Sequence, residues 1–121
     1  MTEKSYEQRV AEAKTRIREV TPEEAVAMHR RGEDAVFLDV REPQEWNLFR
    51  IPGAVHVPLG RLDAGVTAAV PRDRRVVVYC ARGNRSALAA DAMQDMGYAD
   101  VASLAAGITG WAHAGGDVDD A

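Results

Sequence analysis

The chain has 121 residues, 46% of them hydrophobic and 28% charged, which is typical of a globular protein with a single core. Its 19 acidic and 15 basic residues give a net charge of −4, whereas general nucleic-acid binding needs a basic surplus. No apolar run approaches the length of a membrane span, and the polar start MTEKSYEQRV is unlike a signal peptide. One cysteine allows no internal disulfide, so nothing ties the fold to an oxidising compartment. Together these features predict a cytoplasmic protein with no nucleic-acid or membrane partner.

The first third of the chain is expected to alternate between helices and strands. Ser5 to about Arg16 has apolar residues at the spacing of one helical face, which predicts an amphipathic helix packed on the main body or on a partner. A short strand over 17–20 follows. Thr21-Pro22-Glu23-Glu24 predicts the start of a second helix, because Thr suits the N-cap, Pro the first turn and Glu the reciprocal cap. This helix should end at Gly32.

The middle of the chain carries the first candidate for a buried strand. Residues 35–40, Ala-Val-Phe-Leu-Asp-Val, are apolar on both faces apart from one acid, as in strands that helices cover on both sides. The segments expected to follow are a short helix over 42–48, a turn over 51–54, an extended piece over 55–57 and a helix over 61–70.

The last third contains the clearest strand and the clearest helix. Val76 to Tyr79 is a run of strand-forming residues, and Ser86 to Met96 is an alanine-rich amphipathic segment. The remaining expected elements are a strand over 101–104, a helix over 108–114 and a frayed acidic tail over 115–121.

Strands that alternate with helical segments predict βαβ units and an α/β fold with a mostly parallel sheet. In such sheets, ligands bind outside the carboxyl ends of the strands. Asp39 and Cys80 each fall at that end of their predicted strand. We therefore expect polar side chains from two strands to meet at one edge of the sheet.

The turn after Cys80 is short and polar. Such a turn points several backbone N–H groups inward, and the dipole of the following helix adds partial positive charge. Gly83 permits unusual backbone conformations, and Arg82 and Arg85 add two permanent positive charges. These groups favour the thiolate form of the cysteine and would also hold a small oxyanion. The candidate active-site loop around the nucleophile Cys80 consists of Ala81, Arg82, Gly83, Asn84, Arg85 and Ser86.

An unreactive Cys80 is the alternative, because free cysteines are often small buried apolar residues at the end of a strand. Inert buried cysteines avoid charge, however, and here two arginines and a glycine lie within the next five residues. We therefore interpret Cys80 as a reactive residue. The three histidines lack ligand spacing, which argues against a metal site.

Four short segments occur in an order and spacing that single out one family, although each is weak alone. They are Cys80, Gly83 and Arg85 in the pattern Cys-x-x-Gly-x-Arg/Thr; Asp39, Arg41, Glu45 and Trp46 in the pattern Asp-x-Arg-(x)3-Glu-aromatic; Ile51-Pro52-Gly53-Ala54; and Gly107 to Trp111 as Gly-(x)3-Trp. Over about residues 17–118 the chain thus resembles the rhodanese-like family. Two segments depart from it, with Phe49-Arg50 in place of Gly-His and Ala106-Gly107 in place of Gly-Gly.

The resemblance implies a five-stranded parallel sheet with helices on both faces, and a sulfurtransferase that requires no metal or organic cofactor. In the implied mechanism, the Cys80 thiolate takes the outer sulfur of a small anionic donor such as thiosulfate, while Arg82 and Arg85 hold the anionic portion. The resulting persulfide gives its sulfur to a thiol or protein acceptor, since the chain has no second cysteine to resolve it.

Several residues of the motifs are expected to support the site rather than react. Asp39 and Arg41 are predicted to organise the loop through hydrogen bonds; a surface ion pair with Glu45 or a helix cap is the alternative. Trp46 and Trp111 are interpreted as core aromatics.

Two other functions remain open at this stage. The amphipathic N-terminal helix and the acidic tail would suit a non-catalytic regulatory or redox-sensing module. The family's phosphatases have the pattern His-Cys-(x)5-Arg, but the corresponding positions here hold Tyr79 and Ser86, and the shorter loop leaves less room for a phosphoryl group. The expected organisation is a helical extension (1–16), a rhodanese-like domain (17–118) and an acidic tail (119–121).

Overall fold

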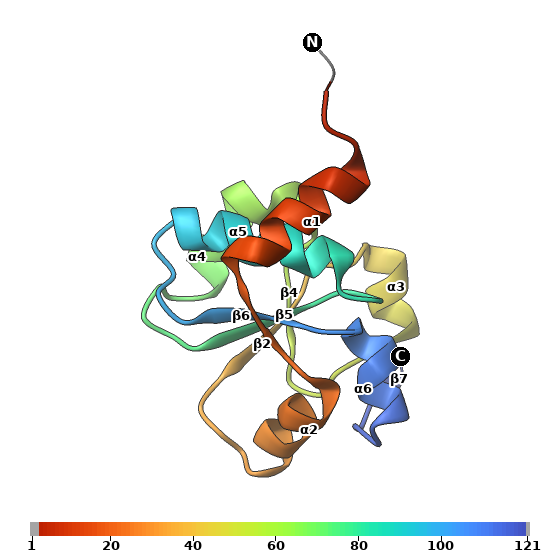
Figure 1. The fold of residues 1–121 in the computed structure, drawn as a ribbon. Helices are drawn as coiled ribbons and strands as arrows, with labels where there is room; N and C mark the ends of the chain where they lie inside the picture. Colours follow the sequence, from red (N-terminus) through yellow and green to blue (C-terminus); the bar gives the residue numbers. More distant parts are fainter. Residues whose placement is uncertain (1–2, 121) are drawn as a thin grey trace.

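The computed structural model describes residues 3–120 of the chain. A parallel sheet of five strands forms the centre of the molecule, with helices above and below it (Figure 1). The strand order is β1-β6-β5-β2-β4, so β5 is central. The strands are β1 (Arg18–Val20), β2 (Val36–Asp39), β4 (Val55–His56), β5 (Val76–Tyr79) and β6 (Val101–Leu104). The predicted α/β class and parallel sheet are confirmed, with all five predicted strands in it.

Helices cover both faces of the sheet (Figure 1). On one face lie α1 (Tyr6–Arg16), α4 (Leu62–Ala69) and α5 (Asn84–Asp95), and on the other lie α2 (Pro22–Arg30) and α6 (Gly107–His113). The short helix α3 (Pro43–Leu48) follows β2, and the 3-10 turn η1 (Leu59–Arg61) leads into α4. This covering explains why β5 is apolar on both faces.

Successive residues of β5 join different hydrophobic cores, as the alternation of side chains along a strand requires. Val76 and Val78 pack into the core under α4 and α5, whereas Val77 and Tyr79 pack into the core under α2 and α6. The same alternation sends the side chain of Cys80, the next residue, toward α4 and α5.

The N-terminal helix packs on the domain rather than standing apart from it. Val10 and Ala13 of α1 are buried, and α1 contacts α5. Arg16 pairs with Asp91 of α5 at 2.8 Å, and Gln94 donates from Nε2 to the Arg16 carbonyl oxygen at 3.0 Å. The amphipathic pattern therefore identified the buried face of α1.

The predicted cap at the start of α2 is confirmed, and α1 has a second capping box that was not predicted from the sequence. Thr21 accepts a hydrogen bond from the Glu24 amide, and the Glu24 carboxylate accepts one from the Thr21 amide. Ser5 and Gln8 form the same reciprocal pair at the start of α1.

The expectation of a frayed acidic tail is wrong for the residues that the structure describes. Asp119–Asp120 forms strand β7, which pairs antiparallel with β3 (Phe49–Arg50), a strand that the sequence pattern did not reveal. The Trp111 indole N–H also donates to the Asp117 carbonyl oxygen at 2.8 Å. These bonds use backbone groups, which any residue type supplies, so acidic composition did not predict them. Met1, Thr2 and Ala121 lie outside the described residues.

Helix α5 begins at Asn84, two residues earlier than predicted, because Gly83 adopts a left-handed conformation that ends the turn there.

Within residues 3–120, no helix combines the length and apolarity that crossing a membrane requires.

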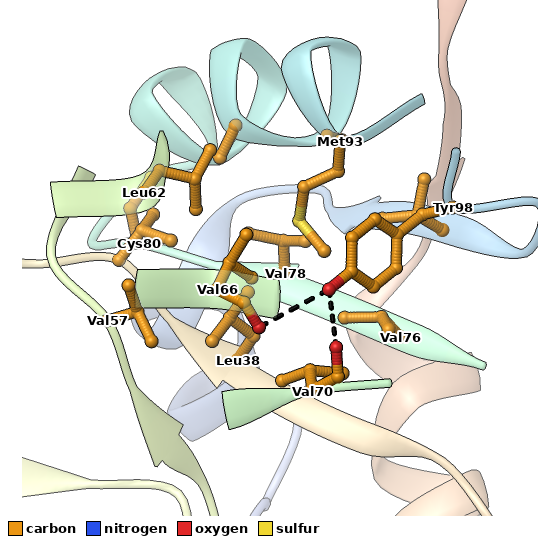
Figure 2. Close-up of a cluster of buried hydrophobic side chains, with 14 residues drawn as sticks. Leu38, Val57, Leu62, Val66, Val70, Val76, Val78, Cys80, Met93 and Tyr98 are labelled. Carbon is orange, nitrogen blue, oxygen red and sulfur yellow. Dashed lines mark hydrogen bonds between the residues drawn. The ribbon is translucent and has the colours of Figure 1, made fainter. Parts of the chain in front are cut away.

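The hydroxyl of Tyr98 donates hydrogen bonds to carbonyl oxygens in and just after α4. Figure 2 shows it directed at the carbonyl oxygens of Val66, 3.3 Å away, and Val70. We expect Tyr98→Phe to lower the free energy of unfolding by about 1–2 kcal/mol, because these buried carbonyl groups lose a donor. Urea denaturation measures the change, and Tyr6→Phe is the control because Tyr6 is exposed. Equal effects of the two substitutions would contradict this role of Tyr98.

Candidate functional site

Cys80 lies immediately after β5, at the carboxyl end of the central strand. The residue is 1% exposed, and one side of it belongs to the core under α4 and α5, beside Leu62 and Val57 in Figure 2. Cys80 is therefore buried and in contact with hydrocarbon, as the alternative interpretation of the sequence required. Its polar contacts distinguish it from an inert core cysteine.

Two backbone amides donate to the sulfur of Cys80. The Gly83 amide lies 3.2 Å from Sγ and the Ser86 amide 3.3 Å. Ser86 is the third residue of α5, and its amide is one of the donors that the first turn of a helix leaves unpaired. The N-cap residue Gly83 has no side chain to satisfy it, so Sγ takes the place that a capping oxygen usually occupies.

Two serine hydroxyls extend this polar contact below the sulfur. Ser86 Oγ lies 3.4 Å from Cys80 Sγ and 2.8 Å from Ser103 Oγ, and both serines are buried. When Cys80 is a thiolate, Ser86 can donate to the sulfur while it accepts from Ser103. Ser103 was missed in the sequence, although a serine within the apolar strand Val101–Leu104 was a visible signal.

The start of α6 holds the loop from the opposite side. The amides of Ile108 and Thr109 donate to the carbonyl oxygens of Cys80 at 2.9 Å and of Ala81 at 3.2 Å. Gly107 permits this approach: its φ is +57°, and a Cβ there would overlap the Ala81 carbonyl group. Since these carbonyl groups face α6, the Gly83 and Ser86 amides are free to face the sulfur.

The two arginines of the loop have different partners. Arg85, expected to hold the substrate anion, instead donates to both carboxylate oxygens of Glu45, at 2.7 and 3.0 Å. These bonds from Arg85 are the main cause that lowers the pKa of Glu45 to about 2, and in turn they raise the pKa of Arg85. Arg82 is exposed and pairs with no carboxylate among residues 3–120. Arg82 is therefore the loop arginine whose charge is available to a ligand.

Asp39 and Arg41 form a buried ion pair with each other, not a surface pair with Glu45. Arg41 donates from Nε and Nη2 to the Asp39 carboxylate at 2.7–3.0 Å, and both residues are at most 2% exposed. Although burial opposes the charged form, these bonds leave the pKa of Arg41 above its ordinary value. Arg41 also donates to the Phe49 carbonyl oxygen at 2.7 Å.

The Asp39–Arg41 pair makes no hydrogen bond to the loop 81–86 among the described residues, so its expected contact with that loop is absent. Its contacts are with the segment that follows β2, where Arg41 donates to the Phe49 carbonyl oxygen, and Glu45 of this segment pairs with Arg85 of the loop. His56 donates from Nε2 to the Arg41 carbonyl oxygen at 2.8 Å and fixes the same segment.

The two tryptophans of the motifs differ in burial. Trp111 is fully buried and packs edge to face on Phe37, as a core aromatic does. Trp46 is only half-buried and stacks on the His56 ring, with 4.7 Å between ring centroids. The core interpretation is therefore confirmed for Trp111 and wrong for Trp46, which lies against a shallow pocket on α3.

A cavity of about 280 Å³ opens above the sulfur. It is lined by Tyr6, Cys80, Ala81, Arg82, Asn84 and Arg85. Four of the six candidate loop residues thus line one pocket with the sulfur, while Gly83 and Ser86 lie beneath it and contact the sulfur. Tyr6 had not been assigned to the site, because only tertiary packing brings α1 to it. The pocket therefore places a sulfur atom beneath a rim that includes the exposed guanidinium of Arg82.

The Glu45–Arg85 pair predicts how stability depends on pH. The pKa of Glu45 is about 2 in the fold and 4.5 ordinarily, so its carboxylate stabilises the fold fully above pH 4.5 and loses this effect as the pH falls toward 2. We expect Glu45→Gln to lower the free energy of unfolding at neutral pH by about 1 kcal/mol and to flatten the acid dependence. Urea denaturation across this range measures both; an equal effect of Glu3→Gln, at an exposed site, would contradict the prediction.

Known proteins share both the sequence pattern and the fold. A model of the rhodanese-like domain matches residues 21–114. The thiosulfate sulfurtransferase GlpE of Pseudomonas syringae is 34% identical over 97 residues, which are 80% of this chain and 89% of GlpE. The probable adenylyltransferase/sulfurtransferase MoeZ of Mycobacterium tuberculosis is 37% identical over 94 residues, which are 77% of this chain and 24% of MoeZ. The chain therefore spans about a quarter of the length of MoeZ.

A solved structure resembles the chain almost from end to end. This Rhodopseudomonas palustris protein of unknown function, a possible tyrosine phosphatase, is 33% identical with a TM-score of 0.87, over 98% of this chain and 97% of its own. The family model covers most of the chain, and the chain covers most of GlpE. By sequence, fold and the loop around its cysteine, this chain belongs to the rhodanese-like domain family.

Proposed function

We propose that this chain is a sulfurtransferase, which moves sulfane sulfur from a small anionic donor such as thiosulfate to a thiol acceptor through a persulfide on Cys80. The observation that carries the proposal is the position of Cys80 Sγ, which accepts hydrogen bonds from the Gly83 and Ser86 amides at the start of α5. Such donors favour negative charge on sulfur, because the helix dipole and the amides both stabilise an anion there.

In the first step, the Cys80 thiolate attacks the outer sulfur of thiosulfate. A new S–S bond forms to Sγ, the S–S bond within thiosulfate breaks, and its electron pair leaves with sulfite. The persulfide stays anionic, so total charge is conserved. Arg82, exposed at the rim, is placed to attract the dianionic donor and to hold the departing sulfite.

In the second step, an acceptor thiolate attacks the outer sulfur of the persulfide. The bond to Cys80 breaks, the electron pair returns to Sγ as thiolate, and the acceptor leaves as a persulfide. The acceptor comes from another molecule, because the chain has no other cysteine.

The relatives support this assignment through what their names state. GlpE is named as a thiosulfate sulfurtransferase and MoeZ as a probable adenylyltransferase/sulfurtransferase. The sulfurtransferase part of both names is shared. Of the two names, only that of GlpE supports thiosulfate as the donor.

Phosphate ester hydrolysis is the second candidate, because the Rhodopseudomonas palustris protein is a possible tyrosine phosphatase. The loop of this chain argues against it. Four residues separate Cys80 from Arg85, Arg85 is bound to Glu45, and the next position holds the buried Ser86. A ring this short offers little room for in-line attack on a tetrahedral phosphoryl group.

Sulfur transfer is tested by incubating the protein with thiosulfate and cyanide and measuring thiocyanate. We expect turnover in the native chain and none above background in Cys80→Ser, because the hydroxyl of serine cannot form a persulfide. Intact mass after donor treatment alone should show one added sulfur atom, which a purely regulatory module need not acquire. Equal rates in both proteins, or Cys80-dependent hydrolysis of an aryl phosphate without thiocyanate formation, would overturn the proposal.

Arg82 predicts a specific defect in donor binding. We expect Arg82→Ala to raise the KM for thiosulfate roughly ten-fold, the size of one charge-assisted contact, with a smaller change in kcat. Arg9→Ala is the matched control, because it removes the same charge from an exposed position on α1 that does not line the Cys80 pocket. An equal rise in KM in both variants would assign the effect to net charge instead.

A further inference from the structure

Helix α1 reaches the active-site pocket although it precedes the residues that match the family model. Its first residue, Tyr6, lines the 280 Å³ cavity above Cys80 together with Asn84 and the two arginines of the loop. The family's motifs do not include this part of the chain. Any role of Tyr6 is therefore specific to chains that carry such a helix.

Tyr6 is held in place by the packing of α1. Val10 and Ala13 bury the helix against the domain, the Arg16–Asp91 pair fixes its far end, and the capping box of Ser5 fixes its first turn. Tyr6 itself remains 46% exposed. Tyr6 and Arg85 line the same pocket.

A second depression adjoins the first. A groove of about 290 Å³ runs along α1 and is lined by Tyr6, Glu7, Val10, Ala11, Lys14 and Asn84. Tyr6 and Asn84 belong to both depressions, so they form the boundary between the groove and the pocket above the sulfur. Asn84 is the first residue of α5 and has a short side chain. Tyr6 therefore contributes the larger of the two side chains at this boundary.

We propose that Tyr6 is a specificity-determining residue whose ring closes the Cys80 pocket on the α1 side and limits the size of the acceptor that reaches the sulfur. The ring, rather than the hydroxyl, performs this role: among residues 3–120 the hydroxyl has no hydrogen-bond partner, and Arg85 is already bound to Glu45. That the acceptor is a thiol rests on the proposed function.

The consequence concerns the second step of sulfur transfer. Small nucleophiles pass Tyr6 without hindrance, whereas a thiol with a bulky body must fit beside the ring. Removing the ring would join the pocket to the groove and give such a thiol space along α1. The bonds made and broken remain those of acceptor thiolate attack on the outer persulfide sulfur.

The test compares one small and one bulky acceptor, cyanide and glutathione, in Tyr6→Ala, Tyr6→Phe and the native chain. We expect Tyr6→Ala to raise kcat/KM for glutathione several-fold relative to cyanide, and Tyr6→Phe to keep the native ratio because it keeps the ring. Thermal unfolding of each variant verifies that the fold is intact, which the exposure of Tyr6 favours. A native ratio in Tyr6→Ala, or a shift of the same size in Tyr6→Phe, would overturn the proposal.

Alkylation provides a readout that needs no sulfur transfer. Because Cys80 is the only cysteine, its modification by iodoacetamide or by the bulkier fluorescein maleimide is followed directly by intact mass. We expect Tyr6→Ala to raise the rate with the bulky reagent relative to the small one. An unchanged rate ratio overturns the role of Tyr6 whatever the turnover. A raised ratio in a chain that transfers no sulfur supports this role and contradicts the proposed function instead.

Discussion

The interaction on which the site depends is the pair of hydrogen bonds from the Gly83 and Ser86 amides to the sulfur of Cys80. Every α-helix leaves amides unpaired in its first turn, and a buried start requires an acceptor for them. Here the acceptor is the sulfur of Cys80, the residue that follows β5. The same two bonds therefore pair the amides at the helix start and contact the sulfur. The loop thereby pairs the first-turn amides of α5 and holds the sulfur of Cys80 in place.

Other backbone groups of the loop are satisfied from the opposite side, which supports this conformation of the loop. The start of α6 donates to the Cys80 and Ala81 carbonyl oxygens, and Gly107 lets the two segments approach closely. The buried pair of Asp39 and Arg41 acts further out, on the segment that presents Glu45. Breaking such a pair is costly because it strands a charge in the interior, so this segment is firmly placed.

The two arginines at the rim of the pocket differ in their partners. Arg85 is committed to Glu45 and holds the loop to α3, whereas Arg82 faces solvent above the sulfur. The guanidinium of Arg82, which pairs with no carboxylate among residues 3–120, suits the reversible binding of a small anion. On the side of α1, Tyr6 supplies an aromatic wall in place of a charge. The pocket therefore combines a cationic rim with one apolar side, and these two parts come from different regions of the chain.

The sequence by itself determined the five strands, the capped helix start at Thr21 and the turn after Cys80, because these depend on periodicity, turn residues and neighbours close in the chain. Only the tertiary structure decided the partner of Arg85, the hydroxyl of Ser103 beneath the site and the approach of Tyr6. Each of these is a contact between elements far apart in sequence. The sequence offers many carboxylates that could pair with Arg85, for example, and only the packing of α3 against the loop selects Glu45. The pairing of β3 with β7 was hidden for a related reason, since backbone hydrogen bonds carry no residue signature.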